Sequence, residues 1–404
     1  MFKIYNKREL DDVRKVGEKM SDTMKNHKRH VRTYRILKTL VLPFFKWLFR
    51  IHSQPAPDMT GPYLVLANHN AELDPVIINF SFKELLYFVA SEHVFRVGFA
   101  SLLLKRYFDP ISRLKGGTDI STVKEVMRRL KNGMNVCIFA EGNCSFNGLT
   151  CPIPPSTGRL AKACGVPLIT YKFEGGYLTT PRWAYTMRHG RMRGYVVNVY
   201  SPEQLKAMSV DEVNAAIADD LFEDSYARQA SEKVRFKGKR LAEGLETAIF
   251  LCPKCERFST LHSRGDEFFC DCGLKAVYDE YGYLSGVPYS TITEWDAWQH
   301  DKLTQIASNL GEEAAFEDTD VTLVRVHTDH KSEIIYSGTT VMHHDRIKCG
   351  ELTFFINDIS DMAIYGRANI TFTCGSGHYE IVSGRTSFCG RRYLELYKQL
   401  KSKT

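Results

Sequence analysis

The chain has 404 residues, of which 44% are hydrophobic and 25% charged, a composition that excludes a largely disordered protein. This length predicts two or three domains, and no apolar run reaches the roughly 20 residues that a membrane-spanning helix needs. The formal net charge is +7, but residues 1–50 hold 14 Lys and Arg against 5 Asp and Glu, so the positive excess is an N-terminal feature. Such a basic arm is expected to bind either nucleic acid or anionic lipid.

The stretch YRILKTLVLPFFKWLFR at 34–50 favours the lipid. At about 100° per residue, one arc of a helix holds Arg35, Lys38, Lys46 and Arg50, and the opposite arc holds Ile36, Leu37, Leu40, Val41, Phe44, Trp47 and Leu48. This pattern is typical of a helix lying in a membrane interface, and the alternative is a helix packed on its own domain with a solvated basic face. Pro43 should kink or split the helix. We expect residues 1–60 to be a basic amphipathic segment for membrane association.

The cellular compartment is predicted from the N-terminus and the cysteines. The first residues, MFKIYNKREL, lack the apolar core and cleavage site of a secretion signal. The eleven cysteines are an odd number, and four of them have a metal-like spacing, which favours a reducing environment. We therefore expect a peripheral or monotopic protein on the cytoplasmic face of a membrane that contains anionic lipids.

Residues 61–245 are predicted to form an α/β domain. The strand candidates are YLVLAN (63–68), MNVCIFAE (134–141), VPLITYKF (166–173) and YVVNVY (195–200). A helix is predicted over 118–133, capped by Thr118 or Asp119 and ended by Gly133, with an apolar face of Val123, Val126, Met127 and Leu130. This alternation predicts a mixed, largely parallel sheet with its active groups at the carboxyl ends of the strands.

Three further regions complete the chain. Residues 250–285 contain Cys252-x2-Cys255-x14-Cys270-x-Cys272, the spacing of a zinc ribbon in which four thiolates hold a structural zinc ion; His262 is an alternative ligand. Residues 290–312 are predicted to be a linker helix. Residues 313–404 read as short strands followed by one helix, a pattern that resembles a pleckstrin-homology or GRAM-type domain.

Two motifs of the α/β domain could carry chemistry. LANHNAELDP places His69 and Asp74 directly after a predicted strand, where a carboxylate could orient an imidazole that acts as a general base. The plain alternative is that Asp74 caps a helix beginning at Pro75. FAEGNCSFNG places Glu141 and Gly142 after another strand.

A third segment, FDPISRLKGGTD, supplies Arg113 and Lys115 in a predicted loop. Arginine is the side chain best suited to a phosphate, because its guanidinium offers paired donors. Together the three segments predict a base, a carboxylate loop and an anion site in one domain.

These blocks, in this order over roughly residues 35–200, resemble the glycerolipid acyltransferases related to 1-acyl-glycerol-3-phosphate acyltransferase. The resemblance implies that His69 is the catalytic base and Asp74 its orienting partner. It also implies that Arg113 binds phosphate and that Glu141 and Gly142 bind substrate. Val166 and Pro167 match the fourth, mostly structural block.

One departure from the family pattern concerns the third block. Cys144 stands where the family has an arginine, and Asn143 stands where threonine is common. A thiol supplies neither charge nor paired donors, so this change should weaken phosphate binding. The candidates to replace the missing cation are Arg159, Lys162, Lys172 and Arg182.

The resemblance implies direct acyl transfer from acyl-CoA or acyl-carrier protein to the hydroxyl of a lysophospholipid, most plausibly 1-acyl-sn-glycerol-3-phosphate. Two alternatives stay open at this point. One is a lipid-binding protein of the same fold that has lost turnover, and the other is a hydrolase or transferase that uses Cys144 as a nucleophile paired with His69. A nucleic-acid partner is not expected, since the cysteine cluster lies outside the basic segment.

Overall fold

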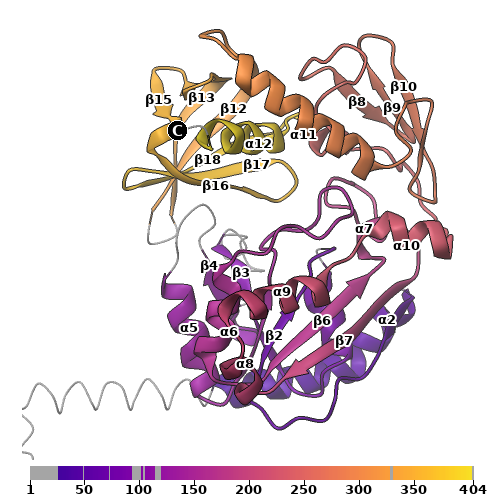
Figure 1. Cartoon of the computed structure of the whole chain (residues 1–404), viewed down its shortest axis with the longest axis vertical. Helices are drawn as coiled ribbons and strands as arrows, with labels where there is room; N and C mark the ends of the chain where they lie inside the picture. The colour runs from indigo at the N-terminus through magenta and orange to yellow at the C-terminus, as the bar shows by residue number, and fades with distance from the viewer. Residues whose placement is uncertain are drawn as a thin grey trace, which may run out of the picture.

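The computed structural model describes residues 26–48, 50–71, 73–92, 102, 105–113, 120–327 and 331–402. Figure 1 shows two lobes, one above the other: an N-terminal lobe from indigo to dark red, and a C-terminal lobe from salmon to yellow. We call residues 26–249 the N-terminal lobe and residues 250–402 the C-terminal lobe.

A seven-stranded sheet forms the centre of the N-terminal lobe, in the order β1-β7-β6-β2-β5-β3-β4. The strands are β1 (Ile51–Ser53), β2 (Leu64–Ala67), β3 (Leu86–Ser91), β4 (Ile111–Arg113), β5 (Asn135–Phe139), β6 (Leu168–Glu174) and β7 (Met192–Tyr200). Every neighbouring pair is parallel except β6 and β7. The predicted mixed, largely parallel sheet is confirmed, and the four strand candidates are β2, β5, β6 and β7.

The central strand β2 is buried on both faces, as a parallel strand between helical layers must be. Val65 and Ala67 belong to one core, and Leu64 and Leu66 belong to another on the opposite face. The helices of this lobe are α3 (Asp74–Ile77), α5 (Ile120–Lys131), α6 (Ser156–Cys164), α7 (Gly176–Thr179), α8 (Pro202–Ala207), α9 (Val210–Leu221) and α10 (Ser225–Glu232), with short 3-10 turns at Ile78–Phe80 and Leu245–Thr247.

Helix α5 departs in part from the predicted apolar face. Val126 and Leu130 are buried in the core, but Val123 and Met127 are 40% and 38% exposed. Arg129 is buried instead, because its guanidinium lies over the ring of Tyr87 and pairs with acidic neighbours. The predicted caps Thr118 and Asp119 lie outside the described residues.

The N-terminal helical segment is split, as Pro43 predicted. Residues 26–40 are helical, Val41 is a turn, and α2 (Leu42–Leu48) follows. Lys38 belongs to the basic arc of the sequence pattern, but its ammonium is partly buried and donates to Tyr34 Oη and to the carbonyl of Phe82. No helix in the described part of the chain combines the length and the apolar character that crossing a bilayer requires.

The C-terminal lobe contains two antiparallel sheets. The smaller has the order β11-β10-β9-β8, with β8 (Leu261–Arg264), β9 (Glu267–Cys270), β10 (Lys275–Tyr278) and β11 (Leu284–Ser285). The larger has the order β15-β14-β13-β12-β18-β17-β16, with β12 (Phe316–Val326), β13 (Ser332–Met342), β14 (Arg346–Cys349), β15 (Leu352–Phe355), β16 (Ile359–Tyr365), β17 (Asn369–Cys374) and β18 (Gly377–Ser383).

Two helices pack in this lobe, α11 (Ile292–Asn309) and α12 (Gly390–Lys401). Figure 1 shows α11 running across the lobe from the larger sheet toward the smaller one. Its Trp295 is buried in the core under the smaller sheet, and its Leu303 is buried in the core of the larger sheet. Helix α11 is therefore a packed element shared by two cores as well as a connection.

Candidate active site

His69 and Asp74 are in direct contact just beyond the end of β2. Asp74 Oδ2 lies 3.0 Å from His69 Nδ1 and also accepts the backbone N–H groups of Asn70 and Ala71, at 2.7 and 2.9 Å. The carboxylate therefore turns back toward the histidine, and the capping interpretation of Asp74 is wrong. Asp74 is fully buried, whereas the His69 side chain is 19% exposed. This arrangement fixes the imidazole through Nδ1 and leaves Nε2 for chemistry.

Glu141 lies beside His69 because their strands are neighbours in register. Ala67 of β2 pairs with Phe139 of β5, so the residues two positions further on emerge together at the same edge of the sheet. Glu141 Oε1 accepts the backbone N–H of His69 at 2.5 Å, and its Oε2 accepts the backbone N–H of Cys151. Burial raises the pKa of the Glu141 carboxyl to about 8, although both backbone donors oppose the change.

Arg113 lies against Gly142, but it is the last residue of β4 and not part of a loop as predicted. Gly142 has a φ of +68°, and a Cβ built there would lie 3.0 Å from Arg113 Nη1, so glycine gives the guanidinium room to approach the backbone. Arg113 also acts electrostatically on Asp361 of β16, where burial raises the pKa of the carboxyl and Arg113 lowers it. Lys115 lies outside the described residues.

Cys144 also lies at this edge of the sheet. Its Sγ lies 3.3 Å from His69 Nε2, on the side of the ring opposite Asp74, and the residue is 8% exposed. Burial alone would lower the pKa of the His69 imidazole, but the sulfur of Cys144 and the carboxylate of Asp74 raise it to about 10. The order Cys144–His69–Asp74 therefore has the connectivity of a nucleophile, a base and an orienting carboxylate.

The loop that holds these groups, residues 141–148, is attached to the C-terminal lobe. Asn147 Nδ2 donates to Asp296 Oδ2 at 2.7 Å, and the hydroxyl of Thr293 donates to the Asn147 carbonyl at 2.7 Å. The ring of Phe146 lies between the guanidinium groups of Arg182 and Arg391, with carbon-to-centroid distances of 4.4 and 4.6 Å. Of these residues, sequence reasoning singled out only Arg182, because no local pattern marks a loop that packs against a distant lobe.

Arg182 is the one candidate replacement cation that contacts this loop. Its Nη1 donates to Asn143 Oδ1 at 3.2 Å, but the rest of the guanidinium donates to the carbonyls of Ile364 and Gly366. Lys162 donates instead to the carbonyl of Met208, and Arg159 is exposed on α6. Arg182 thus fastens the loop to the C-terminal lobe and is already saturated with acceptors from protein.

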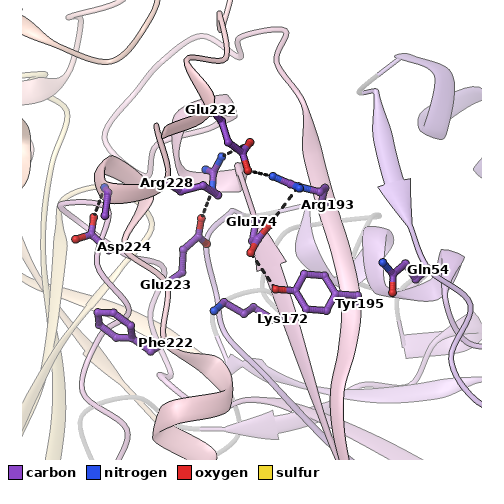
Figure 2. A pocket seen from close by; sticks show the side chains of 11 residues that line it. Gln54, Lys172, Glu174, Arg193, Tyr195, Phe222, Glu223, Asp224, Arg228 and Glu232 are labelled. Carbon is purple, nitrogen blue, oxygen red and sulfur yellow. Dashed lines mark hydrogen bonds and ion pairs between the residues drawn. The ribbon is translucent and has the colours of Figure 1, made fainter. Parts of the chain in front are cut away.

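A pocket of about 520 Å³ lies between strands β6 and β7 on one side and α10 on the other (Figure 2). Lys172 and Glu223 line it, and Glu223 accepts a hydrogen bond from Asn70 Nδ2. The arginines at its rim are engaged with acids: Arg193 with Glu174 and Glu232, and Arg228 with Glu223 and Glu232. Glu223 therefore connects this pocket to Asn70, the neighbour of His69, and the two arginines at the rim are held in ion pairs.

Residues 25–174 match the Acyltransferase family model. The matched segment includes His69, Asp74, Arg113, Glu141 and Gly142, and it supports an acyltransferase domain in the N-terminal lobe.

Among solved structures, the chain is similar to the 1-acyl-sn-glycerophosphate (LPA) acyltransferase PlsC of Thermotoga maritima. The identity is 21% and the TM-score is 0.38, over 46% of this chain and 78% of that protein. A likeness at this level assigns no substrate or residue. No curated protein matches the chain.

The four cysteines of the predicted ribbon come together at one end of the smaller sheet. The sulfurs of Cys252, Cys255, Cys270 and Cys272 all lie within 4.8 Å of one another. The contacts are 3.6 Å between Cys252 and Cys272 and 3.7 Å between Cys255 and Cys270. Tetrahedral Zn²⁺ with Zn–S bonds of about 2.3 Å places its sulfurs about 3.8 Å apart, so the donor set fits that ion. The alternative ligand His262 pairs with Asp271 instead, at 2.9 Å.

Proposed function

We propose that this protein is a membrane-associated acyltransferase that moves a fatty acyl group from an acyl thioester to the free hydroxyl of a lysophospholipid. The donor is acyl-CoA or acyl-carrier protein, and the proposed acceptor is 1-acyl-sn-glycerol-3-phosphate, which gives phosphatidic acid. One observation carries the proposal. Asp74 holds His69 through Nδ1, at the strand edge where Glu141 and Arg113 also lie, inside the segment that matches the Acyltransferase family.

In this reaction His69 assists the transfer of a proton from the acceptor hydroxyl. The hydroxyl oxygen forms a bond to the carbonyl carbon of an acyl thioester, and the carbon–sulfur bond of that thioester breaks to release a thiol. Asp74 stabilises the imidazolium that forms. Arg113 is assigned to the phosphate of the acceptor, and the Glu141–Gly142 turn is assigned to shaping the floor of the substrate site, because Gly142 admits the guanidinium.

Membrane association is supported by the outer face of the N-terminal helices. Ile36, Leu40, Phe44 and Trp47 are between 50% and 75% exposed, and Arg35 and Lys46 are exposed on the same two helices. Exposed aromatic and aliphatic side chains next to lysine and arginine suit an interface of anionic lipid. A lysophospholipid and its acylated product both reside in a membrane, so an enzyme for them gains access by docking there.

A zinc ion is the proposed cofactor, held by Cys252, Cys255, Cys270 and Cys272. Four thiolates leave no open coordination position for water, so the ion would supply structure and no catalytic chemistry. The cluster lies in the C-terminal lobe, whereas His69 lies in the N-terminal lobe, which agrees with a structural role.

The test is acyl transfer by the purified protein and its His69→Ala variant, with long- and medium-chain acyl-CoA and acyl-carrier protein as donors. The acceptor panel includes lysophosphatidic acid and lysolipids with other head groups. We expect lysophosphatidic acid to be acylated by the wild-type protein only. Transfer to a different lysolipid would correct the acceptor, and binding of lipid without any turnover would replace the proposal with the lipid-binding alternative.

A further inference from the structure

We propose that Cys144 is the first acceptor of the acyl group, so that transfer proceeds through a covalent acyl-cysteine intermediate. The inference rests on the proposed function, because it takes its acyl thioester from that reaction. It replaces direct attack by the lipid hydroxyl with two successive attacks at the same carbonyl carbon.

The geometry that carries this inference is the contact between two residues 75 positions apart. Cys144 Sγ lies 3.3 Å from His69 Nε2, while Asp74 holds Nδ1 at 3.0 Å on the other side of the ring. A direct mechanism needs the lipid hydroxyl at Nε2, and the sulfur occupies that position. Among the described residues, Cys144 is the only cysteine whose sulfur contacts a histidine ring nitrogen.

Cys144 also differs from the buried cysteines that serve as packing. Cys137 is fully buried in an apolar core, where burial raises the pKa of its thiol. Cys144 has an imidazole beside its sulfur and lies at the same end of the sheet as His69, which is 19% exposed. A substrate that reaches the His69 ring therefore also reaches the sulfur.

The first half-reaction is an exchange of thioesters. His69 takes the proton of the Cys144 thiol as the sulfur attacks the carbonyl carbon of the acyl thioester, a new carbon–sulfur bond forms, and the bond to the carrier sulfur breaks. The carrier leaves as a thiol after taking the proton from the His69 imidazolium. No oxidant or other reactant is needed, because one thioester and one thiol are converted to another thioester and another thiol.

The second half-reaction uses His69 again as the base. Once Cys144 is acylated, its sulfur no longer helps to raise the pKa of the His69 imidazole, which favours the neutral ring. Neutral His69, still oriented by Asp74, then accepts the proton of the lipid hydroxyl as that oxygen attacks the acyl-cysteine. The ester forms as the bond between the acyl carbon and Cys144 Sγ breaks, and the departing sulfur takes the proton from the His69 imidazolium to restore the thiol.

The experiment traps the intermediate. Purified protein is mixed with radiolabelled acyl-CoA or acyl-carrier protein without lysolipid, quenched in acid and digested for mass spectrometry. We expect one acyl group on the peptide that contains Cys144, released by neutral hydroxylamine and discharged when lysophosphatidic acid is added before the quench. Cys144→Ala and the nearly isosteric Cys144→Ser should lose the acyl thioester and reduce transfer at least about 100-fold.

Cys164→Ala is the control, because this cysteine lies on α6 away from the site and should keep both labelling and transfer. Circular dichroism confirms that each variant is folded. If the wild-type protein transfers acyl groups, the Cys144 variants match its rate and no label is trapped, the intermediate is refuted while the proposed function stands. If label forms on Cys144 but no lysolipid discharges it, the intermediate stands and the acceptor is wrong. If neither label nor transfer is seen with any donor, both proposals fail.

Discussion

The four-cysteine cluster and the contact between Cys144 and His69 both bring a sulfur atom close to another reactive side chain, but they are built differently. The four-cysteine cluster draws its members from residues 252–272, so two short turns bring the sulfurs together. The contact between Cys144 and His69 joins two strand ends that are adjacent only because β2 and β5 pair in register. We expect the cysteine cluster to stabilise the fold and the contact between Cys144 and His69 to carry chemistry. Substitutions at each place should therefore reduce stability in the first case and activity in the second.

The largest expected effect comes from the cluster. Cys252→Ser removes a ligand from the proposed zinc site, and structural zinc contributes about 10–16 kcal/mol of apparent binding free energy in small zinc domains. We therefore expect loss of bound zinc and unfolding of the smaller sheet, measured by elemental analysis and by thermal unfolding with and without a chelator. Cys164→Ala is the control. Full stability and the wild-type zinc content in Cys252→Ser would show that the cluster has no structural role.

Asp74→Asn, at the contact between Cys144 and His69, should reduce activity much more than stability. The amide cannot stabilise the imidazolium and favours the wrong tautomer of His69, so we expect kcat/KM to fall by roughly 10²–10⁴-fold. The free energy of unfolding should fall by only about 1–3 kcal/mol, because the backbone N–H groups of Asn70 and Ala71 lose a charged acceptor. Steady-state kinetics and denaturant unfolding on the same preparation check both expectations. Wild-type kinetics in a folded variant would show that Asp74 is not an orienting group.

Phe146→Ala tests whether stability and catalytic activity are independent. Its ring belongs to the core of the C-terminal lobe although its loop carries Glu141 and Cys144, so stability and activity should fall together, with about 3 kcal/mol of unfolding free energy lost. Phe354→Ala is the matched control, since Phe354 is buried in the same core but lies on β15. It should cost similar stability and leave activity unchanged. Equal activity in both variants would mean that the loop does not depend on Phe146.

The last prediction concerns the pH dependence of stability and the buried Glu141. Burial raises the pKa of Glu141 from its usual range to about 8, so the folded protein prefers the protonated form. The stability that this group contributes is fully present below its unfolded pKa, near 4.5, and is lost as pH rises through about 8. Denaturant unfolding between these pH values should show this decline in the wild-type protein and a flatter profile in Glu141→Gln. Parallel profiles would show that another group is responsible.

Local patterns in the sequence predicted most of the candidate site. His69 and Asp74 lie within five positions, Glu141 follows a strongly apolar strand, and the cysteine spacing is short, so each needed only nearby residues to be recognised. Strands β1, β3 and β4 were not predicted, and β1 and β4 are the two edge strands, with only three residues each. For that reason Arg113 was expected in a loop.

The remaining features depend on contacts between distant parts of the chain. Nothing local to Cys144 indicates that His69 Nε2 faces its sulfur, since that distance is set by the register of β2 and β5. The sequence pattern placed Lys38 on the basic arc of its helix, but its ammonium donates a hydrogen bond to the carbonyl of Phe82. Helical periodicity reports which side chains share a face, but not which neighbouring carbonyl will accept a hydrogen bond.

The attachment of Phe146 to the C-terminal lobe has a consequence for modularity. A fragment ending near residue 249 would keep the whole segment that matches the Acyltransferase family, yet it would leave the Phe146 ring facing water and deprive Arg182 of the carbonyls of Ile364 and Gly366. The lobe boundary is therefore a poor place to divide the protein. Chimeras with related chains should inherit residues 141–148 together with the C-terminal lobe, because these segments fold as one packing unit.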